Sequence, residues 1–110
     1  MSETITIKEF QRMDIRVGRV LKAERVPETK KLIVLEIDIG EEKPRRMVAG
    51  IAEYYKAEEL VGKNLVVLAN LEPKKIRGII SNGMILAADV NGRPYILTVE
   101  DEVPPGSPVR

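Results

Sequence analysis

The chain has 110 residues, of which 44% are hydrophobic and 32% are charged, and its net charge is +1. This length suffices for one domain with a core of its own and is too short for two. Histidine and cysteine are both absent, which excludes disulfides, thiol catalysis and the commonest general base and metal ligands. No group of acidic residues has the spacing of a metal-binding loop. We therefore expect a binding module that is not an enzyme and holds neither a metal nor a cofactor.

No apolar run approaches the roughly 20 residues that a membrane-spanning helix needs, and no signal peptide opens the chain. We therefore expect a cytoplasmic protein with no membrane partner.

The first segment, residues 3–14, predicts a short helix. Thr6 suits the N-cap position, and Glu9 three residues later completes a capping box. Ile7, Phe10 and Met13 would then lie on one face, and we expect Phe10 to plug the core.

Alternating and dense apolar patterns predict three strands in the first half of the chain. Residues 15–23 alternate between apolar and cationic side chains, and Gly18 inside this run indicates a bend or a close backbone approach. Residues 31–40 are rich in Ile, Val and Leu, and a turn separates them from a third strand over 45–50.

The second half of the chain predicts a helix over 51–63, ended by Gly62, and then more strands. These strands are expected at 64–71, 83–90 and 95–100. With the first two of these, the order is three strands, a helix and two strands, which is that of the OB-fold, an all-β, five-stranded Greek-key barrel that binds oligonucleotides or oligosaccharides. The strand at 95–100 falls outside the five. We expect the barrel over about 12–90 of a single domain, 1–110, with a C-terminal extension over about 89–110.

Cations recur in three clusters although the whole chain is nearly neutral. They are Lys30 with Lys31, Arg45 with Arg46, and Lys74, Lys75 and Arg77, in a loop where Glu72 is the one acid. Global neutrality with local positive charge is typical of a surface that docks a polyanion. Any one pair of lysines is more typical of an ordinary solvated surface, whereas three cations in one short loop are less easily explained in that way.

Aromatic residues narrow the class of polyanion. A protein that binds unpaired strands uses aromatic side chains on its sheet for stacking, and none occurs between Ile15 and Gly50. Contacts to the backbone and shape of a folded RNA fit this composition better. A single-stranded DNA binder is therefore a weaker alternative.

Several long motifs resemble the tRNA-binding domain family, which includes free-standing dimeric proteins, C-terminal appendages of methionyl-tRNA synthetases and synthetase-associated cytokine precursors. The motifs are "DIRVG" (14–18), "VPETKKLIVLEIDIGE" (26–41), "VAGIAEYYKAEELVGKNLVVLANLEPKKIRG" (48–78) and "SNGMILAA" (81–88). The resemblance implies an OB barrel whose C-terminal region supports dimerisation. It also implies binding of tRNA at the outer corner of the L, without strict sequence preference.

Carried over by position, the family's tRNA-contacting pattern falls on Lys31, Asn70, Lys75, Arg77, Ser81 and Met84, to which we add the neighbouring Lys30 and Lys74. The cations can neutralise phosphates, and the amide and hydroxyl can hydrogen-bond to sugar or phosphate oxygens. Met84 would pack on an unstacked base, or it is a buried strand residue. Many relatives have His-Pro where this chain has Val26-Pro27, and an Asp-Lys pair at Lys30-Lys31.

We therefore expect a non-catalytic tRNA-binding homodimer that supports a synthetase, such as methionyl-tRNA synthetase, in trans or acts as a tRNA chaperone. The alternative is a tether that dimerises or recruits a synthetase without touching RNA. A free-standing chain is favoured by the initiator Met, although an excised domain could look the same.

Overall fold

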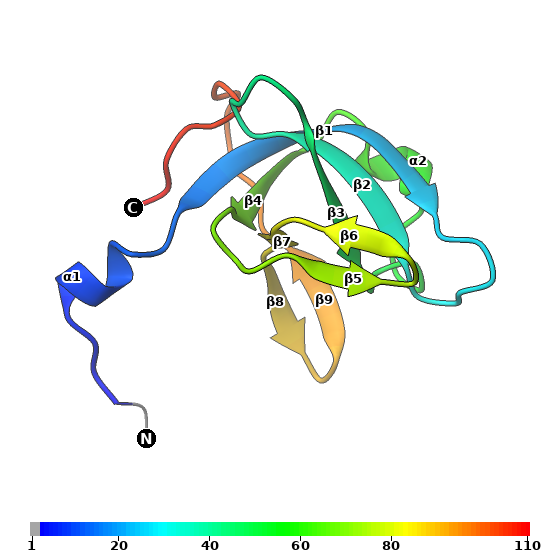
Figure 1. The fold of residues 1–110 in the computed structure, drawn as a ribbon, viewed down its shortest axis with the longest axis horizontal. Helices are drawn as coiled ribbons and strands as arrows, with labels where there is room; N and C mark the ends of the chain where they lie inside the picture. Colours follow the sequence, from blue (N-terminus) through cyan, green and yellow to red (C-terminus); the bar gives the residue numbers. More distant parts are fainter. Residues whose placement is uncertain (1–2) are drawn as a thin grey trace.

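The computed structural model describes residues 3–110, which form a small antiparallel barrel with two appended hairpins (Figure 1). The elements are α1 (Ile7–Phe10), β1 (Ile15–Arg25), β2 (Ile33–Asp38), β3 (Arg45–Ala49), α2 (Ala57–Leu60), β4 (Asn64–Leu68), β5 (Lys74–Ile76), β6 (Ile79–Ser81), β7 (Met84–Ile85), β8 (Ala87–Val90) and β9 (Arg93–Ile96). The main sheet has the strand order β3-β2-β1-β4-β7. The predicted all-β, OB-like barrel is confirmed, with short helices at its N-terminus and between strands three and four.

The barrel curves because β1 is long enough to pair with two different strands. Its first half pairs with β4 up to Arg19, and its second half pairs with β2 from Arg19 onward, with a shift of register at Leu21. Gly18 lies in the first half, and a Cβ atom there would stand 2.5 Å from Cγ2 of Ile37. The predicted close approach at Gly18 is therefore confirmed, since no side chain fits at this position.

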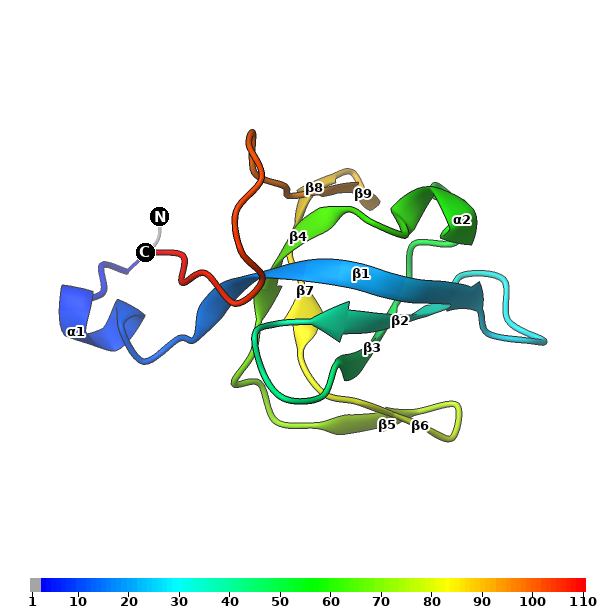
Figure 2. The ribbon, with the colours of Figure 1, turned by 90° about the horizontal axis from the view of Figure 1, so that it is seen from above.

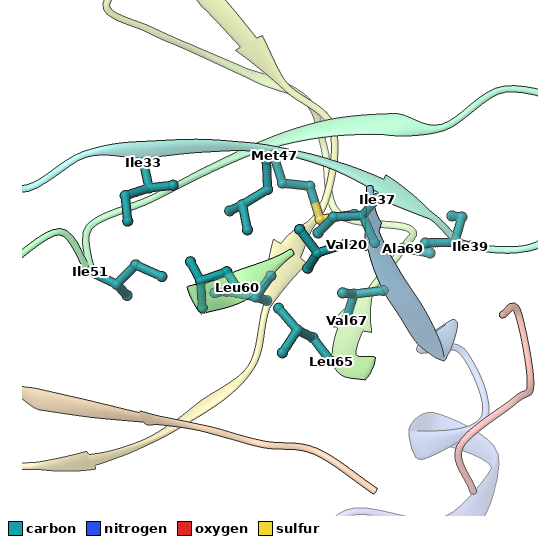
Figure 3. Close-up of a cluster of buried hydrophobic side chains, with 12 residues drawn as sticks. Val20, Ile33, Ile37, Ile39, Met47, Ile51, Leu60, Leu65, Val67 and Ala69 are labelled. Atoms are coloured by element: carbon teal, nitrogen blue, oxygen red, sulfur yellow. The ribbon is translucent and has the colours of Figure 1, made fainter. Parts of the chain in front are cut away.

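Alternation along the strands builds the core. In β2, Ile33, Leu35 and Ile37 point inward and are fully buried, while the residues between them are partly exposed. All three belong to one cluster with Leu60 of α2 and Val67 of β4, and Figure 3 shows Ile33 and Ile37 among these side chains. One apolar cluster thus stabilises the barrel that positions the surface residues.

The helix predicted over 51–63 is wrong in extent. Only α2, four residues long, is helical, and residues 52–54 form a turn. The backbone N–H of Ala52 donates to the carbonyl of Lys31 at 2.8 Å, and the Tyr55 hydroxyl accepts from the N–H of Ile96 at 3.1 Å. Tertiary bonds to two distant segments thus override the helical propensity of this run. Gly62, with a φ of +89°, ends the helix as expected.

The predicted N-terminal helix is present, and its capping box between Thr6 and Glu9 is confirmed. The prediction that Phe10 plugs the core is wrong, because Phe10 is half-buried and lies outside the core cluster. The segment carrying α1 extends away from the barrel (Figure 1), and Ile7 is 70% exposed. A face that the apolar pattern assigned to the core is therefore open in the single chain.

Two stretches in the second half differ from their predicted form. The basic stretch is a β-hairpin, β5–β6, rather than a loop. The run 83–90 is two strands, because β7 pairs with β4 while β8 turns away to pair with β9. Figure 2 shows the two hairpins on opposite sides of the barrel.

The last residues lie along the barrel as an added edge. The N–H of Val17 donates to the carbonyl of Ser107 at 2.9 Å, and the N–H of Gly106 donates to the carbonyl of Val17 at 2.7 Å. A further bond, from Val109 to Ile15, measures 2.8 Å. The proline-rich end is therefore an edge segment and not a central strand, as predicted. Within residues 3–110 no helix is long and apolar enough to cross a membrane.

Candidate nucleic-acid interface

The tip of the β5–β6 hairpin is a two-residue turn at Arg77 and Gly78, whose φ angles are +51° and +80°. Positive φ at both central residues defines a type I′ turn, for which Asn-Gly is the strongly preferred pair. The β8–β9 hairpin follows this preference, since Asn91 and Gly92 have φ angles of +51° and +88°. In the basic hairpin, by contrast, an arginine occupies a backbone conformation that is unfavourable for this residue type. A residue that conflicts with its local geometry is a sign of function.

A second basic segment meets this tip. Lys30 and Lys31 line a hollow together with Arg77, although they lie more than 40 residues earlier in the chain. Their loop is held in shape by the Arg25 guanidinium, which donates to the carbonyls of Thr29 and Lys30 at 3.2 and 3.4 Å. The structure thus brings three of the predicted cations together on an ordered backbone.

Lys74 and Lys75 add two further cations, from strand β5 of the same hairpin as Arg77. Both side chains are exposed, and their alternation along the strand directs them to opposite faces of the hairpin. In the part of the chain that the structure describes, none of the salt bridges involves Lys30, Lys31, Lys74, Lys75 or Arg77. Five positive charges therefore remain available to a ligand, and we call these five residues the cationic edge.

Arg45, which belongs to the predicted cluster of Arg45 with Arg46, has a different role. Its guanidinium donates to the Glu41 carboxylate at 2.9 and 2.8 Å and to the backbone carbonyl of Ala69. Arg16 is engaged in the same way by Asp14, at 2.9 and 2.8 Å, and by the carbonyl of Ile39. These arginines join strands at one end of the barrel and do not form a free basic surface.

The same network shifts the titration of its acids. The hydrogen bond from Arg16 holds the pKa of Asp14 below its ordinary value, and the hydrogen bond from Arg45 does the same for the pKa of Glu41. In both cases the bond outweighs the opposing effect of desolvation. The ionised network is thus the form that the fold favours.

Asn70 uses its side-chain amide within the protein. Its Nδ2 group donates to the carbonyl of Arg12 at 2.6 Å, and its Oδ1 atom accepts from the N–H of Asp14 at 2.9 Å. The amide therefore joins the N-terminal segment to the end of β4. Of the predicted site residues, Asn70 is thus one whose side chain is engaged within the protein.

Ser81 is also engaged internally and is buried. Its Oγ atom accepts from the N–H of Val48 at 2.9 Å, and its hydroxyl lies 3.4 Å from the carbonyl of Gly83. The N–H of Asn82 donates to the carbonyl of Arg46 at 2.8 Å beside it. Ser81 thus closes the barrel between β3 and the segment leading to β7, and it anchors the base of the basic hairpin.

Met84 is 44% exposed, so the alternative that it is a buried strand residue is wrong. It lines a groove of about 310 Å³ beside the basic hairpin. Val48, Leu71, Glu72, Lys74, Ile76, Ser81 and Gly83 are the other lining residues. Leu71 and Ile76 were not predicted from the sequence, because an isolated apolar residue between polar ones gives no signal that it lines a groove.

Among residues 3–110, no three Asp or Glu side chains are grouped closely enough to hold a metal ion. The chemistry that the surface offers is therefore that of ammonium and guanidinium groups beside an apolar groove.

Comparison with known families shows which protein family this chain belongs to. The family described as "Putative tRNA binding domain" matches residues 15–108, which include the barrel, both hairpins and most of the C-terminal edge segment. The chain belongs to this family. Membership of the tRNA-binding domain family confirms the resemblance drawn from the sequence motifs.

Curated relatives of this tRNA-binding domain are parts of much longer chains. Methionine–tRNA ligase of Archaeoglobus fulgidus is 59% identical over 107 residues, covering 97% of this chain and 16% of the ligase. Methionine–tRNA ligase of Thermotoga maritima is 53% identical over 105 residues, again covering 16% of its length. The chain thus spans about one sixth of the curated relatives that it matches.

Solved structures contain the tRNA-binding domain as a whole chain. The methionyl-tRNA synthetase (MetRS) related protein of Pyrococcus horikoshii is 41% identical, with a TM-score of 0.92 over 99% of this chain and 100% of that one. The chaperone CsaA of Bacillus anthracis is 30% identical, with a TM-score of 0.88 over 98% and 100% of the two chains. The family and these relatives confirm the prediction of a non-catalytic binding module.

Proposed function

We propose that this protein binds folded tRNA through the phosphate backbone, at the outer corner of the L and without strict sequence preference. The observation that carries the proposal is that Lys30, Lys31 and Arg77 meet from two distant segments, while Lys74 and Lys75 are exposed on the same hairpin as Arg77. Among residues 3–110, none of these five cations takes part in a salt bridge. Phosphate contacts from Lys and Arg fix position and orientation on a nucleic acid but do not read its sequence. Recognition would then depend on where the phosphates lie, which is a property of the folded RNA.

The arrangement of the charges favours a shaped ligand over a flexible one. Lys30 and Lys31 sit on a loop whose backbone is hydrogen-bonded by Arg25, and Arg77 sits on a two-residue turn. Cations on ordered backbone lose little conformational freedom on binding and hold a fixed spacing. The outer strands β1 to β3 carry no aromatic residue, so stacking of single-stranded bases has no platform there.

The cellular role that fits this activity is support of a synthetase, such as methionyl-tRNA synthetase, in trans, or protection of tRNA as a chaperone in the cytoplasm. The relatives named methionine–tRNA ligase and MetRS related protein support the first role, and the relatives named chaperone CsaA support the second. A tether that recruits a synthetase without touching RNA is the competing function. Such a tether has no use for unpaired cations on an ordered edge.

The proposal also includes a homodimer, for which the β8–β9 hairpin and the N-terminal segment are the expected contacts. Tyr95 on β9 and Leu97 just after it are 43% and 41% exposed, and Val90 on β8 is 52% exposed. Ile7 on α1 adds a separate open apolar side chain. Exposed apolar patches of this kind mark interaction surfaces. They lie away from the cationic edge (Figure 2), so that dimerisation would leave the RNA-binding surface free.

The deciding experiment is a titration of the full chain with mixed tRNA, single-stranded DNA and duplex RNA at several salt concentrations. We expect the highest affinity for tRNA, with a steep decrease as salt rises. A variant with Lys31→Gln and Arg77→Gln should lose most of this affinity. The matched control is Lys56→Gln with Lys63→Gln, which removes exposed charge on the α2 side of the barrel. Equal losses in both variants, or equal affinity for all three nucleic acids, would contradict the proposal.

A further inference from the structure

The groove beside Met84 is the surface feature that phosphate binding leaves unexplained. Its walls are apolar, formed by Val48, Leu71, Ile76 and Met84, and Leu71 and Met84 are 42% and 44% exposed. It opens next to Lys74 on the cationic edge. The positive charges attract the phosphates of an RNA to this edge, but the apolar walls of the groove provide neither charge nor hydrogen bonds to a phosphate. A flat apolar group attached to a phosphate chain satisfies both surfaces.

Glu72 raises a second question about the same groove. It is the one acid between Asn70 and Ala88, and it lines the groove from the segment just before the basic hairpin. Among residues 3–110, neither Glu72 nor Lys74 takes part in a salt bridge. A free carboxylate on a phosphate-binding surface repels the ligand. Its presence is explained if the carboxylate accepts hydrogen bonds from the ligand.

We propose that this groove binds one unstacked guanine base of the RNA. Leu71, Ile76 and Met84 would contact the faces of the base, as apolar side chains do in pockets that hold extruded bases. Guanine presents two neighbouring donors, N1–H and the N2 amino group, and one acceptor, O6. The Glu72 carboxylate matches the two donors, and the Lys74 ammonium matches the acceptor.

The donor and acceptor pattern distinguishes guanine from the other bases. Adenine, with an acceptor at N1, would place that lone pair against the Glu72 carboxylate, which cannot donate when ionised. Uracil and cytosine have smaller faces and at most one of the two adjacent donors. This inference rests on the proposed function, because it adds a base contact to the same RNA-binding surface. It also predicts a local sequence preference that phosphate contacts alone would not create.

The first test compares two variants that remove one negative charge each. Glu72→Gln changes the groove, and Glu42→Gln changes an exposed acid outside it. Charge alone predicts that both variants bind an unmodified tRNA transcript slightly more tightly than the parent. The proposal predicts the opposite sign for Glu72→Gln, a loss of about fivefold or more, typical of one lost bidentate base contact. The salt dependence should be unchanged, because no phosphate contact is lost.

The second test is independent of tRNA. The chain has four methionines, so the methyl resonance of Met84 can be followed by NMR after methionine labelling. Guanosine 5′-monophosphate should shift this resonance saturably and adenosine 5′-monophosphate should not, and Glu72→Gln should abolish the shift.

Three results would overturn the inference. The first is equal or tighter tRNA binding by Glu72→Gln, and the second is an equal response of Met84 to the two nucleotides. The third is a Met84 shift caused by an apolar peptide and not by the guanine nucleotide, which would assign the groove to a polypeptide. If the parent fails to bind tRNA, the proposed function is wrong, and the nucleotide titration still decides whether the groove holds guanine.

Discussion

Replacing Arg77 with Asn should make the protein more stable and a weaker tRNA binder at the same time. The residue occupies the first central position of a type I′ turn with a φ of +51°. Asn adopts this conformation more readily than Arg does, so relief of the backbone penalty should add about 0.5–1 kcal/mol to the free energy of unfolding. For a domain of this size the melting temperature should rise by about 2–4 °C.

The effect on binding follows from the loss of one cation from the cationic edge. Each neutralised phosphate contributes about 0.7–0.9 to the slope of log affinity against log salt concentration. Over a fourfold increase in salt, the parent should therefore lose about threefold more affinity than the variant. The weakening should be similar for all tRNA species, because the contact is to the backbone.

The matched control places the same dipeptide in the other hairpin. Asn91→Arg creates an Arg-Gly turn at an identical φ of +51° on the opposite side of the barrel. Asn91→Arg should lower the melting temperature by the amount that Arg77→Asn raises it. The salt dependence of tRNA binding should stay that of the parent. Melting curves and anisotropy titrations at several salt concentrations measure both quantities. An unchanged slope for Arg77→Asn, or a loss of stability, would refute the argument that charge is held there against the turn's preference.

Three further outcomes are expected. Gly18→Ala should destabilise the barrel by about 1–3 kcal/mol in urea unfolding, since the new methyl group would overlap the buried side chain of Ile37. Gly50→Ala is the control and should not destabilise it, because a Cβ atom at Gly50 would meet no other atom within 4 Å. Because the pKa values of Asp14 and Glu41 are lowered in the folded state, their contribution to stability is complete above the ordinary carboxyl pKa and is lost as pH falls through the lowered values. Asp14→Asn should therefore reduce the fall in melting temperature at acid pH. An unaltered dependence of melting temperature on pH would count against the network. The chain should sediment as a dimer and Leu97→Glu as a monomer; a monomeric parent would disprove the dimer.

The sequence predicts the barrel well because its strands carry strong signals. The dense run that becomes β2 and the alternation along β1 follow directly from burial of one face. The Asn91-Gly92 turn is also predictable, because the dipeptide matches the geometry. The basic hairpin was missed for the converse reason, since three-residue strands show no period and Arg77-Gly78 is not a favoured turn pair.

The candidate site was predictable in its charges and not in its supports. Exposed lysines depend little on tertiary context, so their availability follows from composition and local pattern. Asn70 bonds to residues 56 and 58 positions away, and Ser81 bonds to one 33 positions away. Nothing near either residue in the chain indicates those partners. The same holds for Arg16, which outwardly resembles a free surface cation and in fact joins Asp14 to the carbonyl of Ile39.

The C-terminal segment along β1 also has a consequence for self-association. Residues 15–17 would otherwise present an open strand edge, because β2 pairs with β1 only from Arg19 onward. Unpaired backbone groups in a row are templates on which strands of other molecules add, leading to aggregation. A chain shortened before Pro104 should therefore precipitate rather than form a well-behaved smaller domain. The prolines in this segment limit the same hazard further out, since Pro105 and Pro108 have no N–H to offer to another strand.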